Sequence, residues 1–399
     1  MGGALRAPPK KPSLNNKIMI KKLLDNYNPL IWLSALGAGG ISIGAFVILQ
    51  YTLWGKKGLA VMSQMEQTPI VLLLEAIMLI FGSISLALTI YYGIVAWKWR
   101  KTEKYHSYSE NPLVNAGLMA MYVSLAMSLN VFIGVVRYFS DYLSSNFQSL
   151  MLPGFIAFAI LWFTIMNKEI QLLAKTFTKG FDMDKIHFGW LLHPFALGMI
   201  TVTGTGLAAM SHTSWIAEVS AFMTLISGTM GMFLMSVKLF SIFKKHFHQE
   251  GALDNQFMPT YIIVIPIITV FAISYFRLGH FAENNLGVTK ENIHFLLEFG
   301  MATAFAFQVW YFWFGLVMLK DYWKNYFKTH FHVSQWGVIC PFVGFSVLGG
   351  FIFKLLASYS AFFYFLIGVL LIAVVLYLYL LKRQFKCIKA KKTKNFICD

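Results

Sequence analysis

Long apolar segments alternate with short polar ones along almost the whole chain. The apolar segments lie at about 29–54, 69–97, 112–137, 149–166, 189–211, 214–237, 258–277, 293–319, 335–358 and 361–381. Each is long enough to cross a hydrocarbon core of roughly 30 Å as a helix, which takes about 20 residues. The pattern predicts an all-α integral membrane protein with ten transmembrane helices.

The same pattern divides the chain into three parts. We expect a basic tail at 1–28, a ten-helix domain at 29–381 and a second basic tail at 382–399. The first apolar segment is longer than the core of a cleaved signal peptide, so it is interpreted as a retained span.

Composition agrees with a membrane location and argues against a soluble protein. Hydrophobic residues make up 57% of the chain and charged residues 13%, whereas soluble proteins carry roughly 25% charged residues. The net charge of +16 comes from clusters between the apolar segments. This is typical of membrane loops and disfavours nucleic-acid binding.

The positive charges also predict an orientation. Most of the 33 lysines and arginines lie in the two tails and in the second, fourth, sixth and eighth loops. With ten spans these segments share one side, which the positive-inside rule assigns to the cytoplasm. We expect both termini to be cytoplasmic, in an inner or plasma membrane.

Small, hydroxyl-bearing and proline residues recur along the odd-numbered helices, while the even-numbered helices are bulky. Such faces allow close helix packing, and they also suit the wall of a narrow path. The predicted pore-lining residues are Gly40, Gly44, Ser124, Ser128, Gly198, Thr201, Thr205, Pro266, Thr269, Pro341 and Gly344. We expect an inner ring of odd helices and an outer ring of even helices.

Ionisable residues mark one end of this arrangement. Cations close three odd helices, and carboxylates open three even ones. They could neutralise one another at the membrane surface, or the cations could form an outer vestibule that concentrates anions. The predicted vestibule residues are Arg137, Arg277 and Lys354, and the predicted charge partners are Glu75, Glu218 and Glu298.

One stretch imitates a cofactor motif. Gly204-x-Gly206-x-x-Ala209 matches the glycine spacing of dinucleotide-binding loops. Such a loop must follow a strand and open a helix. Here it lies deep inside a span that begins at His193-Pro194, so we interpret the match as coincidental.

Four segments carry a family resemblance. "NPLIWLSALGAGGIS", "HPFALGMITVTGTGLA", "VIPIITVFAISYF" and "WGVICPFVGFSVLG" resemble the first, fifth, seventh and ninth spans of the tellurite-resistance/dicarboxylate transporter family. This family includes TehA and the SLAC-type anion channels. The resemblance implies five helical hairpins around a pseudo-five-fold central pore, with one pore in each subunit of a homotrimer.

The resemblance also implies a gate. In that family a phenylalanine on the ninth span occludes the pore, and the matching positions here are Val338 and Cys340. Phe342 and Phe345 lie about a turn away and are the candidate gate residues, although they could equally be packing residues.

The expected function is passage of small anions such as inorganic oxyanions, halide or C4-dicarboxylates, without enzymatic activity. We expect the bilayer and the anion as partners, and no cofactor or metal. A membrane redox or haem-anchoring subunit is one alternative, since there are ten histidines. A non-transporting structural membrane protein is another. The three cysteines form no CxxC motif and predict no disulfide framework.

Overall fold

A computed structural model describes residues 24, 27–53, 68–248, 253–356, 358–389 and 397–398. Within this part of the chain, ten helices are long and apolar enough to cross a membrane, as predicted. They are Pro29–Tyr51, Pro69–Trp99, Asn115–Val136, Phe147–Lys179, Phe188–Met210, Ser214–His248, Met258–Asn285, Ile293–Met318, Val333–Leu355 and Ser360–Cys387.

Five of these spans are largely enclosed by the others. We call their α-helices the central helices: α2 (Trp32–Ile48), α5 (Met119–Val131), α8 (Leu192–Met210), α10 (Val264–Asn285) and α13 (Ile339–Leu355). Each packs on the next, and α13 packs on α2, so the five close a ring. In the most apolar 18-residue window of each of these five spans, 50 to 100% of the residues are buried.

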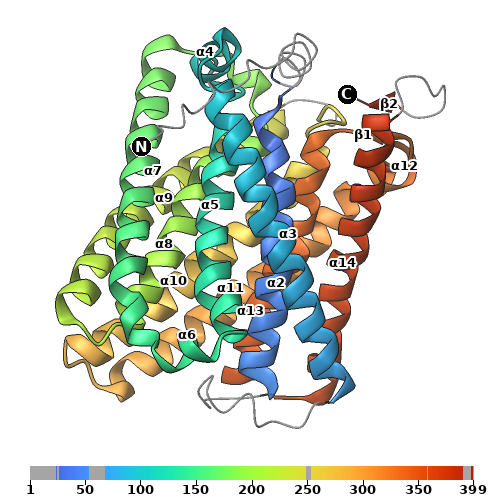
Figure 1. The fold of residues 1–399 in the computed structure, drawn as a ribbon. Coiled ribbons are helices and arrows are strands. Elements are labelled where there is room, and N and C mark those ends of the chain that lie inside the picture. Colours follow the sequence, from blue (N-terminus) through green and yellow to red (C-terminus); the bar gives the residue numbers. More distant parts are fainter. Residues whose placement is uncertain are drawn as a thin grey trace, which may run out of the picture.

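The other five helices surround this ring, as Figure 1 shows for α3 and α14 beside α2. We call them the peripheral helices: α3 (Pro69–Trp99), α7 (Met151–Lys179), α9 (Ser214–His248), α11 (Lys290–Met318) and α14 (Ser360–Lys389). Only 22 to 39% of their corresponding windows are buried. Their exposed Leu, Ile, Phe and Trp side chains are suited to contact with lipid.

The central helices share a local design at one end. Each central span opens with a short 3₁₀ segment before its α-helix, and these segments are η1 (Pro29–Ile31), η4 (Asn115–Leu118), η8 (Phe188–Leu191), η9 (Met258–Ile263) and η11 (Val333–Val338). Three of them have a side-chain cap, from Asn28, His187 and His332. Caps satisfy backbone N–H groups that a helix start leaves unpaired.

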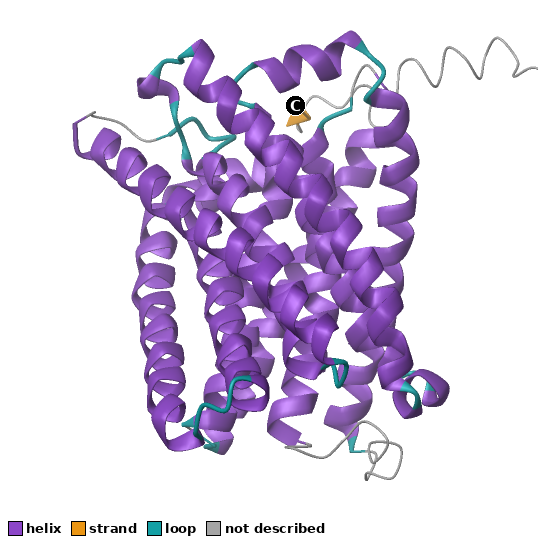
Figure 2. Cartoon of the chain, turned by 90° about the vertical axis from the view of Figure 1, so that its left-hand side faces the viewer, coloured by secondary structure: helices purple, strands orange, loops and turns teal. Residues whose placement is uncertain are grey.

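We call this end of the bundle the basic end, because the loops rich in Lys and Arg lie there. It carries α4 (Glu103–Glu110), α12 (Phe327–Thr329) and a parallel pair of two-residue strands, β1 (His330–Phe331) and β2 (Ile397–Cys398). Figure 1 places these elements at one end of the bundle and α6 (Asp141–Ser145) at the opposite end, and the orange strand in Figure 2 lies at the same end as in Figure 1. Arg383 donates to the carbonyls of Phe327 and His330 and so ties α14 to this end.

The predicted tails and loops are partly helical. The tail at 1–28 lies almost wholly outside the described residues. The first eight residues of the tail at 382–399 continue α14, and α7 and α9 extend about a dozen residues beyond their predicted ends. Cys387 is disulfide-bonded, which the sequence did not predict, whereas Cys340 is a free thiol.

Hydroxyl groups hold peripheral helices onto central ones. The Ser42 hydroxyl donates to the Met78 carbonyl at 2.8 Å, and Ser85 donates back to the Ala35 carbonyl at 2.9 Å. The hydroxyls of Thr201 and Ser227 are hydrogen-bonded at 2.8 Å. Such bonds satisfy polar groups that would find no partner in lipid.

Glycine permits the closest of these contacts. A Cβ added to Gly204 would lie 2.4 Å from both Phe158 of α7 and Thr224 of α9. These separations are far shorter than van der Waals contact, so α8 can lie this close to Phe158 and Thr224 only because residue 204 lacks a side chain.

We therefore expect Gly204→Ala to lower the stability of the purified protein. Overpacking of this kind costs about 1–3 kcal/mol, and it should appear as a lower melting temperature in detergent. Gly300→Ala on α11 is the matched control, since a Cβ there meets nothing within 4 Å. Equal melting temperatures for the two variants would contradict the packing argument.

Candidate functional site

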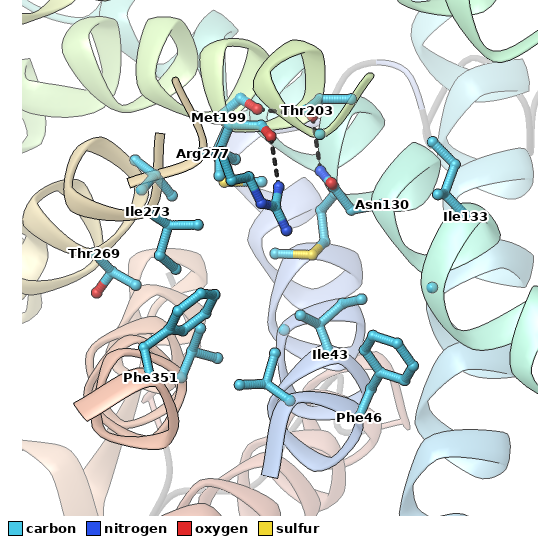
Figure 3. Close-up of a pocket in the computed structure, with 18 of the residues that line it drawn as sticks. Ile43, Phe46, Asn130, Ile133, Met199, Thr203, Thr269, Ile273, Arg277 and Phe351 are labelled. Atoms are coloured by element: carbon cyan, nitrogen blue, oxygen red, sulfur yellow. Dashed lines mark hydrogen bonds between the residues drawn. The ribbon is translucent and has the colours of Figure 1, made fainter. Parts of the chain in front are cut away.

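The central helices enclose a chamber of about 380 Å³. All five contribute to its wall, together with residues that follow α2 and α5 and the start of the Phe147–Lys179 span. Figure 3 shows Ile43, Asn130, Thr203, Ile273 and Phe351 arranged around the space. The helix contacts that close the ring also shape this chamber.

Arg277 brings a positive charge into the chamber. Its Nη1 atom donates to the Val202 carbonyl at 2.8 Å, and Figure 3 shows the rest of the guanidinium directed into the open space. The side chain fits against α8 because residue 206 is glycine, where an added Cβ would lie 3.3 Å from Nη1. Gly206 therefore helps place the cation.

Arg137 and Lys354 also line the chamber. They are close to the end of the bundle that lies opposite the basic end. The Arg137 guanidinium carbon lies 3.9 Å from the centre of the Phe147 ring, and the Lys354 ammonium lies 4.6 Å from that of Tyr51. Tyr51 belongs to η2 (Leu49–Leu53), a π-helical turn that ends the first span. Aromatic faces stabilise cations that have lost part of their hydration.

The three predicted vestibule cations thus face one cavity, but the predicted carboxylate partners do not join them. Among the described residues, no aspartate or glutamate lines the chamber. Glu75 accepts a hydrogen bond from Tyr138, and Glu298 pairs with His294 at 3.0 Å. Glu218 has no ion pair within the described ranges. Within the described residues, Arg137 and Arg277 therefore face the chamber without a carboxylate in its wall.

The structure divides the predicted pore-lining residues into two groups. Gly40, Pro266, Thr269 and Gly344 line the chamber. The remaining seven do not: Gly44, Ser124, Ser128, Gly198, Thr201, Thr205 and Pro341.

Several of this second group are explained by helix packing. Ser128 bonds to Thr89 of α3 at 2.7 Å, and Thr201 bonds to Ser227 of α9. A Cβ at Gly198 would lie 2.6 Å from Val270 of α10. On α8 the chamber instead meets residues such as Met199, Thr203 and Gly206, so the predicted stripe and the chamber wall lie on different faces of that helix.

The candidate gate residues Phe342 and Phe345 also point elsewhere. Phe342 packs edge-on against Phe312 of α11 with ring centres 5.0 Å apart. Phe345 contacts Phe305 of α11 and Phe365 of α14. Neither lines the chamber, and both pack between central and peripheral helices.

A smaller pocket of about 80 Å³ lies at the basic end, where the central spans begin. We call it the basic-end pocket. It includes Tyr108 of α4, His187 and Thr260. Phe195 and Cys340 line both this pocket and the chamber, and they therefore stand between the two cavities.

His187 is a neutral part of the basic-end pocket. Its ring stacks on Phe257 with centres 3.8 Å apart, and Nδ1 accepts the Gly189 N–H. Burial lowers the pKa of His187 from its ordinary 6.5 to about 4, with a smaller contribution from Lys245. The side chain is therefore uncharged at neutral pH.

A buried charged cluster that the sequence did not predict lies between α7, α8 and α9. His193 Nδ1 is 2.7 Å from the Glu169 carboxylate, and Lys238 lies 4.6 Å from the centre of the Trp190 ring. All three side chains are at most 5% exposed, and Glu169 interacts electrostatically with Lys238. Lys238 directly follows the apolar segment predicted at about 214–237. In the structure α9 continues to His248, so Lys238 lies within the helix.

Comparisons with known proteins assign no family to the chain. No protein-family model matches it, and no curated protein matches it.

The buried cluster predicts a specific stability pattern. Glu169→Ala should lower the free energy of unfolding by about 1–3 kcal/mol, because it leaves the buried His193 Nδ1 without its hydrogen-bond partner. Adding His193→Ala to Glu169→Ala should then cost less than His193→Ala costs in the wild-type protein, because the pair is already broken. Denaturant unfolding in detergent measures the three variants, and strictly additive losses would refute the pairing.

Proposed function

We propose that the protein passes small anions across a membrane through the ring of central helices. The observation that carries this proposal is a chamber lined by Arg137 and Arg277 with no carboxylate in its described wall. A cavity of one charge sign raises the local concentration of the opposite ion. Cations would be repelled from the same space.

The position of the two cavities supports a path along the bundle. The chamber reaches the ends of α10 and α13, while the basic-end pocket lies at their starts. Phe195 and Cys340 contribute to both, so a solute that moves between the cavities has to pass them. We infer that the Phe195 ring is the constriction, in place of the candidates on the ninth span.

The remaining features of the proposal come from the sequence. The distribution of Lys and Arg supports cytoplasmic termini, which puts the basic end in the cytoplasm and the chamber cations on the outer side of an inner or plasma membrane. The resemblance to the tellurite-resistance/dicarboxylate transporter family supports a pseudo-five-fold pore and a homotrimer.

We expect purified protein in proteoliposomes to pass anions and to exclude Na⁺ and K⁺. The panel comprises chloride, nitrate, sulfite, thiosulfate and succinate, measured as flux under a concentration gradient and as current under voltage. Lys354→Glu should lower anion flux severalfold, because it removes a positive charge and adds a negative one. Lys386→Glu, outside both cavities, is the control. Absence of flux for every anion would reject the proposal.

The constriction predicts a gain of function. Phe195→Ala should raise anion flux, because it removes the ring between the chamber and the basic-end pocket. Phe342→Ala is the matched control, since Phe342 packs against Phe312 and should leave flux unchanged in folded protein. If anion flux rises with Phe342→Ala but not with Phe195→Ala, the constriction lies on the ninth span and not at Phe195.

A further inference from the structure

On α5 and α8, the polar groups of Asn130 and Thr203 in the chamber wall are already bonded within the protein. The Thr203 hydroxyl donates to the Met199 carbonyl at 2.8 Å, and it accepts from Asn130 Nδ2 at 2.7 Å. Asn130 Nδ2 also donates to the Ala126 carbonyl at 2.9 Å. These hydroxyl and amide protons are therefore not offered to a ligand.

The same holds across the chamber on α10. The Thr269 hydroxyl donates to the Ile265 carbonyl at 3.0 Å and accepts from Gln308 of α11 at 2.6 Å. Asn130, Thr203 and Thr269 therefore offer no donors that could replace the water around a small inorganic anion, whose dehydration is costly without them.

The chamber does offer one guanidinium and an apolar surface. Arg277 is fixed by the Val202 carbonyl, and the space in front of its free side is bordered by Ile43, Ile273 and Phe351 in Figure 3. A guanidinium edge matches the two oxygens of a carboxylate in a bidentate pair. The cavity volume of about 380 Å³ lies in the range of sites for organic small molecules.

The other two cations are less available as a second carboxylate site. Arg137 lies against the Phe147 ring and Lys354 against the Tyr51 ring, near the chamber end. Their charges attract an anion into the chamber. Deeper in the chamber, the Arg277 guanidinium is the group that can form a bidentate pair with a carboxylate.

We propose that the chamber binds an organic monocarboxylate, with its carboxylate on Arg277 and its apolar body against Ile43, Ile273 and Phe351. This inference rests on the proposed anion passage and narrows its substrate class. An apolar body replaces water along the wall, so affinity grows with the length of the hydrocarbon chain until the space is filled.

The test is calorimetric titration of the full-length protein in lipid nanodiscs at pH 8, with empty nanodiscs subtracted. The probes are acetate, butyrate, hexanoate, succinate and chloride. We expect about a fourfold gain in affinity for each added methylene, from about 0.8 kcal/mol per buried CH₂. Hexanoate should bind more tightly than succinate or chloride. Equal affinities for acetate and hexanoate, or tighter binding of succinate, would overturn the proposal.

Variants separate the charge from the wall. Arg277→Lys keeps the charge but loses the fork, and it should weaken hexanoate binding about tenfold or more while chloride binding changes little. Ile273→Asn should flatten the dependence on chain length, whereas Ile273→Val should preserve it. Chain-length dependence that is unaffected by both Arg277→Lys and Ile273→Asn would place the ligand elsewhere and reject the site.

Binding and flux fail independently. If chloride and nitrate pass but affinity does not depend on chain length, anion passage stands and the substrate class is wrong. If hexanoate binds as expected but no anion, hexanoate included, crosses proteoliposomes, the binding site stands and the proposed passage is wrong.

Discussion

A polar group inside a membrane-spanning bundle has to find its partner within the protein, and this constraint governs both the fold and the chamber. Ser42 and Ser85 meet it by bonding across α2 and α3. Thr203 and Thr269 meet it at the chamber wall, where their hydroxyls bond to backbone carbonyls. The bonds that hold the helices together therefore also occupy the hydroxyls at the chamber wall, and they leave the Arg277 guanidinium directed into the space.

The glycines of α8 show how one short stretch serves two surfaces. Gly204 faces α7 and α9 and allows both to approach, while Gly206 faces α10 and leaves room for the Arg277 guanidinium. The spacing that imitates a dinucleotide loop is accounted for by packing on one face and cation placement on another. A change at Gly204 would act on stability, whereas a change at Gly206 would act on the placement of the Arg277 charge in the chamber.

The sequence was sufficient for the ten spans, because hydropathy over about 20 residues directly reflects the thickness of the membrane. It also singled out Arg137, Arg277 and Lys354, which line one chamber in the structure. It could not assign hydroxyls to the chamber, because small residues serve helix packing and cavity walls alike, and Thr201 and Ser128 bond to peripheral helices. Phe195, the constriction that we propose, could not be singled out either, since one apolar side chain among many carries no distinguishing pattern. The cluster of Glu169, His193 and Lys238 depends on contacts between three helices, which no local pattern reveals.

Phe195 and Cys340, which line both cavities, lie within the first turns of α8 and α13, close to the basic end. Under the proposed passage, a membrane voltage falls mainly where the path is narrow and poor in water, and little of it falls along the wide chamber. Moving one elementary charge through 100 mV involves about 2.3 kcal/mol. An ion resting beside Arg277 would therefore have crossed little of the voltage, and nearly all of the electrical work would be done in the single step past the Phe195 ring.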